Sequence, residues 1–369
     1  MAETTTTTHI ATSARMSVRA GNEYIRREIA PMDRLSKFYG DLKSAGRVSF
    51  GNGGNQIEWR PTLSARTIRA GAGNPSGVSF NQTTTEKVAQ LPYRTYDMGE
   101  HTTKFEKLAT QSGGGYFGSI TKILKSLSKD FIRDYGPKFY KDGSATGSKD
   151  IHGLESWFGS TGALISNSVF VNPSDTYAGL STALGVTGSW TAEASNGWPT
   201  GTGDVEYHSF SPFLIDYNAT ALGGSTTNFA NQWEFAINRV QTYMLVLQRV
   251  TPNSLYLAPS LYASAKDSLK GAQRFTTTAD SSLVRLGHRT LQYDGMEVTT
   301  EYGIPTAVGY FLSWEYLELR VMGSQLIEME EDYDIRTGQK LYKLDTYQNL
   351  VCDAPSYQGK MLAITAAGT

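Results

Sequence analysis

The stretch SGGGYFGSITKILKSLSKDFIRDY, residues 112–135, has the clearest periodicity in the chain. Its apolar residues recur at spacings of three and four, which predicts a single amphipathic helix. They are Phe117, Ile120, Leu124, Leu127 and Phe131. Ser112 is placed to cap this helix, and Gly136-Pro137 is a stop signal after it. At the standard rise the helix would be about 36 Å long, which is the scale of a structural strut.

Four cations lie on the other faces of this helix: Lys122, Lys125, Lys129 and Arg133. A basic helical face can contact the phosphate backbone of DNA without reading its sequence. The alternative is that these cations pair with Asp or Glu nearby. The sequence is compatible with both interpretations.

Residues 46–111, which precede the helix, alternate between apolar and polar positions and contain glycine-rich turns. This pattern predicts a long two-stranded β-hairpin, the extended loop. Because an isolated hairpin is marginal in water, we expect the extended loop to lie on a neighbouring copy of the chain. The candidate intersubunit residues are Ile57, Trp59, Arg60, Arg66 and Arg69.

The chain begins with small and polar residues, and this composition predicts that residues 1–45 form an N-terminal arm.

Residues 151–310, which follow the helix, mix loops, strands and further helices. The strongest helical pattern spans 228–248, and Pro252 ends it. A short buried strand is expected at 254–258, followed by a helix at 259–269. This segment is therefore expected to form a mixed domain.

Residues 311–369 are β-rich, and their two longest strands are expected to turn at 334–339. Gly338 is available there for a positive φ. No repeat at a fixed spacing is evident, so the predicted fold class is α+β with two appended extensions. The predicted parts are an arm (1–45), the extended loop (46–111), a first helical part (112–150), the mixed domain (151–310) and the β-rich return (311–369).

The chain has few charged residues for its length, and their signs are unevenly distributed along it. Charged residues make up 19% of the 369 residues, while Gly (37) and Tyr (21) are plentiful. Residues 1–150 carry 22 Lys or Arg against 14 Asp or Glu, a net +8, and the remainder carries 12 against 21, a net −9. Opposite-sign surfaces suit nucleic acid or the docking of neighbouring copies. The alternative is a solvated surface with chance asymmetry.

Cys352 is the single cysteine, so an intrachain disulfide and a multi-cysteine metal site are excluded. The N-terminus lacks the order of a secretory signal, and no apolar stretch reaches the roughly 18 residues of a membrane span. These features predict assembly in a reducing cytoplasm, away from membranes.

Catalytic motifs are not evident. The histidines lack the paired helical spacing of zinc proteases and are interpreted as surface or structural residues. They are His9, His101, His152, His208 and His288. Residues 143–149 miss the spacing of a phosphate-binding loop, and residues 71–77 miss that of a dinucleotide motif.

An acidic run covers Glu328, Glu330, Glu331, Asp332 and Asp334. Several carboxylates can hold a divalent cation. Since alternate residues of a strand point to opposite faces, a solvated edge or a basic neighbour is favoured. The sequence therefore predicts no catalytic residue, no cofactor and no metal site.

Several short stretches resemble tailed-phage major capsid proteins in their amino-acid sequence. The order of these stretches along the chain is similar as well. The stretches are DIHGLESWF (150–158), DTYAGL (175–180) with Trp190 beyond it, PNSLYL (252–257) with Leu261-Tyr262 beyond it, DGMEV (294–298) and YFL (310–312). The order of arm, long hairpin, long helix, mixed domain and β-rich return is similar over most of the chain.

This resemblance implies a Hong Kong 97-type capsid fold, in which 112–150 and 311–369 form a peripheral domain and 151–310 an axial domain. It also implies a major capsid protein of a tailed double-stranded DNA phage, assembled in the host cytoplasm as hexamers and pentamers of an icosahedral shell and located in the virion. The long helix would face the packaged DNA. The implied partners are further copies of the chain, a portal, a separate scaffolding protein and a decoration protein. Some relatives cross-link a loop Lys to an Asn of a neighbour, for which Lys87 and Asn349 are candidates.

Two other functions stay open. One is a cellular nanocompartment shell, similar to encapsulin, with the same fold and a protein cargo. The other is a glycan-binding or glycan-hydrolysing surface protein, suggested by Trp157, Trp190, Trp198 and the many tyrosines.

Overall fold

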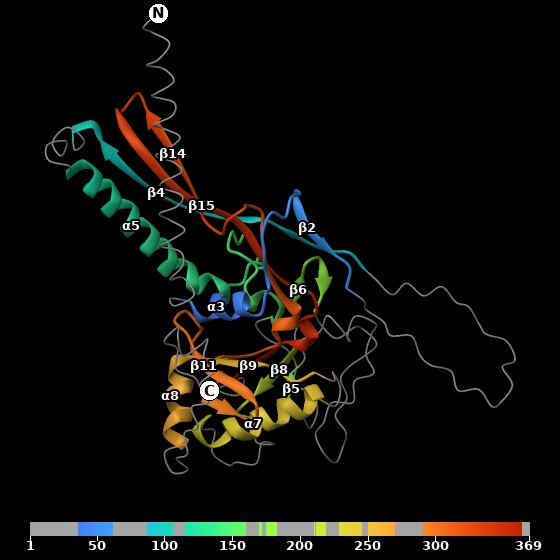
Figure 1. Cartoon of the computed structure of the whole chain (residues 1–369). Coiled ribbons are helices and arrows are strands. Elements are labelled where there is room, and N and C mark those ends of the chain that lie inside the picture. Colours follow the sequence, from blue (N-terminus) through green and yellow to red (C-terminus); the bar gives the residue numbers. More distant parts are fainter. Residues whose placement is uncertain are drawn as a thin grey trace, which may run out of the picture.

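A computed structural model shows an elongated molecule with a five-stranded and a seven-stranded sheet at opposite ends of a buried junction (Figure 1). The structure describes the following residues: 36–61, 87–105, 115–159, 170–171, 175–182, 210, 212–218, 229–245, 250–269 and 291–363. Most of the predicted arm and the middle of the extended loop lie outside these ranges.

The five-stranded sheet is organised around one long strand, β15. On one side β15 pairs with β14 and then with β13, on the other side it pairs with β4, and β1 adds to β13 in parallel. The strands are β1 (Val48–Ser49), β4 (Arg94–Thr103), β13 (Leu317–Val321), β14 (Glu328–Asp334) and β15 (Gln339–Cys352). Gly338 has φ +65° in the turn between β14 and β15, as the sequence predicted.

The long helix α5 (Gly115–Tyr135) lies along one face of this sheet, where the ring of Tyr135 meets that of Tyr96 at 6.2 Å. Its existence and end point confirm the periodicity argument. The α-helix ends just before Pro137, but the chain stays helical beyond it, because proline is tolerated in the first turn of a new helix. The chain therefore continues as the 3₁₀ helix η2 (Gly136–Tyr140).

The seven-stranded sheet has the order β10-β11-β9-β12-β16-β8-β5. Its strands are β5 (Phe170–Val171), β8 (Phe213–Asp216), β9 (Ser254–Leu257), β10 (Leu291–Tyr293), β11 (Met296–Thr300), β12 (Gly309–Leu312) and β16 (Gly359–Leu362). Helices α7 (Phe229–Tyr243) and α8 (Pro259–Ser268) lie beside this sheet at the end of the molecule away from α5 (Figure 1). Both helices and β9 lie where the sequence predicted them.

The extended loop differs from its prediction. Only β2 (Gln56–Trp59) and β3 (Ala89–Pro92) pair as a hairpin within the described residues. The chain after Pro92 leaves the hairpin, because Arg94–Thr103 pairs over its whole length with β15. Alternation alone cannot separate one long strand from two consecutive strands that have different partners.

The β-rich return was predicted to form a single part of the fold, and the structure differs from this prediction. Strand β16, near the end of the described chain, pairs with β8 and β12 and so lies in the seven-stranded sheet. Strand β12 straddles the expected boundary at 310/311. Residues 311–363 therefore contribute to both sheets.

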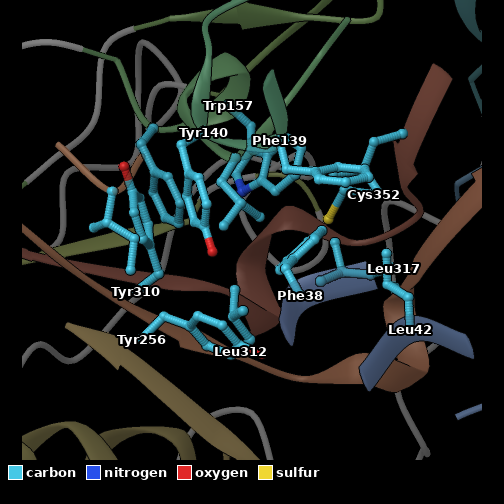
Figure 2. Close-up of a cluster of buried hydrophobic side chains, with 14 of the residues drawn as sticks. Phe38, Leu42, Phe139, Tyr140, Trp157, Tyr256, Tyr310, Leu312, Leu317 and Cys352 are labelled. Carbon is cyan, nitrogen blue, oxygen red and sulfur yellow. The ribbon is translucent and has the colours of Figure 1, made fainter. Parts of the chain in front are cut away.

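Helix α3 (Lys37–Ser44) fills the junction between the two sheets, although it lies inside the segment predicted as an arm. The Phe38 side chain is fully buried, and its ring centroid lies 5.0 Å from that of Phe139 and 5.5 Å from that of Trp314. Tyr140 and Tyr256 complete the surround (Figure 2). One aromatic cluster therefore joins α3, η2, the β12–β13 connection and the seven-stranded sheet.

We predict that Phe38→Ala lowers the free energy of unfolding by about 3–5 kcal/mol, because it removes a buried ring that four other rings contact. Phe235→Ala on α7 is the control, since that side chain is 55% exposed and should change stability by only about 0.5 kcal/mol. Urea unfolding of the unassembled chain measures both. Equal losses for the two variants would contradict the central place of Phe38.

Candidate functional surfaces

The four predicted cations of α5 form one exposed stripe. Lys122, Lys125, Lys129 and Arg133 follow one another at spacings of three, four and four residues, and all four are exposed. The opposite side of the helix buries Leu124, Leu127 and Phe131 against the core. The basic stripe spans about 16 Å at 1.5 Å per residue and faces away from the sheet.

The four cations differ in whether they form ion pairs with nearby carboxylates. Arg133 lies 3.5 Å from Asp130 and 3.3 Å from Asp134, so its charge is largely balanced. Lys122, Lys125 and Lys129 form no ion pair with any residue that the structure describes. Three ammonium groups thus project together without a described counter-charge, an arrangement that attracts a polyanion.

The far face of the five-stranded sheet has the opposite charge. Glu328, Glu330 and Asp332 on β14 are exposed, and strand alternation places them on the side away from α5. Lys343 lies 3.8 Å from Glu330, and Lys340 pairs with Glu331. The favoured interpretation of the acidic run is therefore supported, with part of the basic neighbour supplied by β15 of the same chain.

The base of the extended loop is anchored inside its own chain. Ile57 on β2 is only 3% exposed and Leu91 on β3 is 1% exposed. The Gln90 backbone N–H donates to the Ala178 carbonyl at 3.1 Å, and Trp59 packs against Tyr177 at 6.1 Å between ring centroids.

These contacts correct the assignment of Ile57 as an intersubunit residue, because its side chain is buried within the subunit. Trp59 is only partly buried, so its contact with a neighbour stays a prediction. Arg60 is exposed, and its role toward a neighbour stays a prediction. Arg66 and Arg69 lie outside the described residues.

His152 is a satisfied structural histidine, as predicted. It is 5% exposed, its backbone N–H donates to Asn349 Oδ1 at 2.8 Å, and its Nδ1 lies 2.8 Å from Asn349 Nδ2. Burial lowers the pKa of His152 to about 4, and the nearby Arg94 charge adds to this. His101 is exposed on β4, and His9, His208 and His288 lie outside the described residues.

The same contacts overturn Asn349 as a cross-linking residue. Its side chain is fully buried on β15, and its amide also donates to the Pro92 carbonyl at 2.7 Å. A lysine of another chain cannot reach this group without unfolding the sheet.

Other sequence motifs turn out to be structural where they are described. In the loop 141–150, Asp142 Oδ1 accepts the Ser144 and Ala145 backbone N–H groups at 2.8 and 3.2 Å, so these donors are not free for a phosphate. Trp157 and Cys352 are fully buried. Residues 71–77, Trp190 and Trp198 are not among the described residues.

Within the described ranges, no three His, Cys, Asp or Glu side chains gather in a way that could hold a metal ion. None of the described helices is long and apolar enough to cross a membrane.

Comparison with known proteins identifies the fold. No protein-family model and no curated protein sequence matches this chain. Among solved structures, the capsid of cyanophage A-1(L) matches with a TM-score of 0.56 at 14% identity, over 86% of this chain and 90% of that chain. The capsid of the native GTA particle matches with a TM-score of 0.50 at 8% identity, over 88% and 90% of the two chains. The virus-like particle from Pyrococcus furiosus aligns with a TM-score of only 0.41 at 9% identity, over 94% and 99%.

The chain therefore has the α+β fold of tailed-phage major capsid proteins, the Hong Kong 97 type that the sequence resemblance implied.

We predict that the free energy of unfolding falls by about 3 kcal/mol as the pH is lowered from about 6.5 to about 4. Unfolded His152 binds a proton near its ordinary pKa of 6.5, whereas in the folded chain its pKa is about 4. The unfolded state therefore binds more protons in this window, and acid favours it. Urea unfolding at a series of pH values measures the effect.

His152→Gln should flatten this part of the pH profile, whereas His101→Gln should leave it unchanged because His101 is exposed. An equally steep profile in His152→Gln would show that other groups cause the acid sensitivity.

Proposed function

We propose that this chain is the major capsid protein of a tailed double-stranded DNA phage and assembles as hexamers and pentamers into an icosahedral shell around the genome. The observation that carries the proposal is the likeness of fold to the cyanophage A-1(L) capsid, which extends over 86% of this chain and 90% of that one. The role is structural, and we assign no catalytic residue. The virion is the location that follows from it.

In this proposal, each part of the fold corresponds to a part of a capsid subunit. The five-stranded sheet and α5 form the peripheral domain, and the seven-stranded sheet with α7 and α8 forms the axial domain around the symmetry axes. The extended loop, including Arg60, reaches over a neighbouring copy. A portal, a separate scaffolding protein and a decoration protein are the further partners that such a shell would use.

Charge supports one orientation of the peripheral domain. The basic stripe of α5 and the acidic far face of β14 lie on opposite sides of one helix–sheet layer. DNA would be attracted to the first face and repelled by the second. We therefore propose that Lys122, Lys125, Lys129 and Arg133 face the packaged DNA.

Assembly tests the proposal directly. Purified protein, alone and with its scaffolding partner, should form closed particles in negative-stain images and sediment far faster than a 40.4 kDa monomer. A chain that stays monomeric under all assembly conditions would refute it.

The contents of the particles separate a virus from a nanocompartment. Genomic DNA inside native particles supports the capsid, whereas one enclosed enzyme would support the compartment. The glycan-binding alternative loses one of its residues, because the Trp157 side chain is fully buried in the core.

We predict that the double substitution Lys125→Glu and Lys129→Glu reduces the DNA retained by the shell, because it reverses two unpaired charges of the basic stripe. DNA per particle, measured by the ratio of absorbance at 260 and 280 nm, should fall at low salt. The difference from the unaltered protein should narrow at high salt, where phosphate contacts weaken.

The matched control is Lys141→Glu with Lys149→Glu, which reverses two exposed cations outside the helix. Equal DNA loss in both double variants would assign the effect to total charge and would refute a DNA-facing stripe.

A further inference from the structure

The two sheets are joined by buried polar contacts as well as by the aromatic cluster. Glu301 directly follows the last residue of β11, a strand of the seven-stranded sheet, and is 9% exposed. Its Oε2 accepts the Tyr140 hydroxyl at 2.6 Å and the Phe38 backbone N–H at 3.1 Å. Tyr140 ends η2, the continuation of α5. One carboxylate of the seven-stranded sheet therefore holds both the end of the long helix and the start of α3.

A second carboxylate crosses the junction in the reverse direction. Glu155 belongs to the 3₁₀ helix η3 (Leu154–Trp157), on the side of α5 and the five-stranded sheet. It accepts the Tyr310 hydroxyl from β12, and its Oε2 lies 2.6 Å from Lys360 Nζ on β16. Tyr310 is fully buried, and Lys360 is 5% exposed.

The two tyrosine rings stack on each other between these carboxylates. Their centroids are 5.9 Å apart, and the planes differ by 30°. Figure 2 shows the two hydroxyls pointing in opposite directions, so each tyrosine reaches a carboxylate of the other side. We call Tyr140, Glu301, Tyr310 and Glu155 the crossed clasp.

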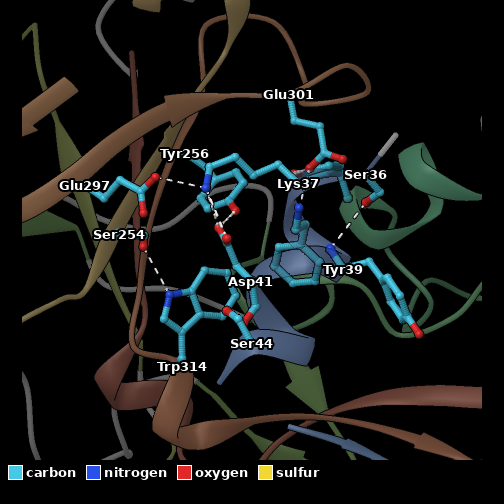
Figure 3. Close-up of polar contacts among 12 residues, drawn as sticks. Ser36, Lys37, Tyr39, Asp41, Ser44, Ser254, Tyr256, Glu297, Glu301 and Trp314 are labelled. Carbon is cyan, nitrogen blue, oxygen red and sulfur yellow. Dashed lines mark hydrogen bonds and ion pairs between the residues drawn. The ribbon is translucent and has the colours of Figure 1, made fainter. Parts of the chain in front are cut away.

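Helix α3 adds charged contacts beside the crossed clasp (Figure 3). Lys37 is 1% exposed and lies 3.0 Å from Asp41 and 2.9 Å from Glu297 of β11. Asp41 also accepts the Tyr256 hydroxyl from β9. The contact between α3 and the seven-stranded sheet therefore includes hydrogen bonds and ion pairs as well as aromatic packing.

Directional contacts of this kind restrict the junction more than apolar packing does. Apolar side chains tolerate small rotations of one layer on another, whereas a buried carboxylate that loses its donor keeps the full cost of desolvation. Burial raises the pKa of Glu301, and the donors from Tyr140, Ser36 and Phe38 counteract that rise. The group is thus stabilised only while η2, α3 and β11 keep their present spacing.

We propose that the crossed clasp sets the angle between the five-stranded and seven-stranded sheets and thereby fixes the curvature of the assembled shell. The inference rests on the proposed shell function. In a closed shell, a change of angle within each subunit adds up around the particle, so a loosened clasp allows particles of different size. Tyr140 and Tyr310 are positioning residues in this account.

The test compares tyrosine-to-phenylalanine variants, which remove a hydroxyl and keep the ring. Tyr140→Phe with Tyr310→Phe opens both halves of the crossed clasp. Tyr177→Phe is the matched control, because it also removes one buried hydrogen bond, from the Cys352 backbone N–H at 2.9 Å, but within the five-stranded side alone. Glu301→Gln is the conservative variant, since its amide oxygen can still accept from Tyr140 and Phe38.

Two measurements are made on each protein. Hydrogen exchange of the unassembled subunit should show that amides 38–42 exchange roughly tenfold to a hundredfold faster in the double variant, as expected for a lost hydrogen bond to a charged group. Electron micrographs of assembled particles should show a broadened or multiple diameter distribution for the double variant. The control and Glu301→Gln should each keep the single diameter of the unaltered protein.

Unchanged particle diameters in the double variant would overturn the inference, as would equal broadening in Tyr177→Phe. If the double variant does not accumulate as folded protein, the two single variants carry the same comparison. Failure of the unaltered protein to form shells would instead overturn the proposed function, and it is seen before any variant is compared.

Discussion

The burial of α3 between the two sheets is the constraint on which the rest of the structure depends. The chain crosses from one sheet to the other between β12 and β13 and again between β15 and β16, and α3 fills the gap between the sheets. Phe38 closes this gap by contacting residues of η2, of β9 and of the β12–β13 connection. With that ring in place, the end of α5 and the start of the seven-stranded sheet share one core, and the long helix has a fixed direction relative to both sheets.

The fixed direction of α5 determines on which side of the five-stranded sheet its charged residues lie. Because α5 is held against one face of the five-stranded sheet, its lysines project to one side and the carboxylates of β14 to the other. In the proposed shell, the basic face of this layer would lie toward the packaged DNA and the acidic face toward the exterior. The near-zero net charge of the whole chain, −1, conceals this separation.

The sequence predicts local features well and tertiary partners poorly. The helix at α5, strand β9, helix α8 and the turn at Gly338 depend on periodicity, proline and glycine, which are local signals. Pairing of β4 with β15, burial of Ile57 and the hydrogen bonds between Asn349 and His152 depend on residues far away in the sequence, up to about 250 positions for the β4–β15 pair. A polar residue in an alternating pattern looks exposed until its partner strand is known. The crossed clasp had no sequence signal for the same reason, since its two carboxylates meet hydroxyls 155 and 161 positions away.

The most direct test of the account is a cryo-electron microscopy reconstruction of the particles formed by the purified protein. We expect a closed icosahedral shell of hexamers and pentamers in which the α5 stripe of Lys122, Lys125 and Lys129 lines the interior and β14 faces outward. A shell with α5 on its outer surface, or an assembly without closed symmetry, would contradict the account.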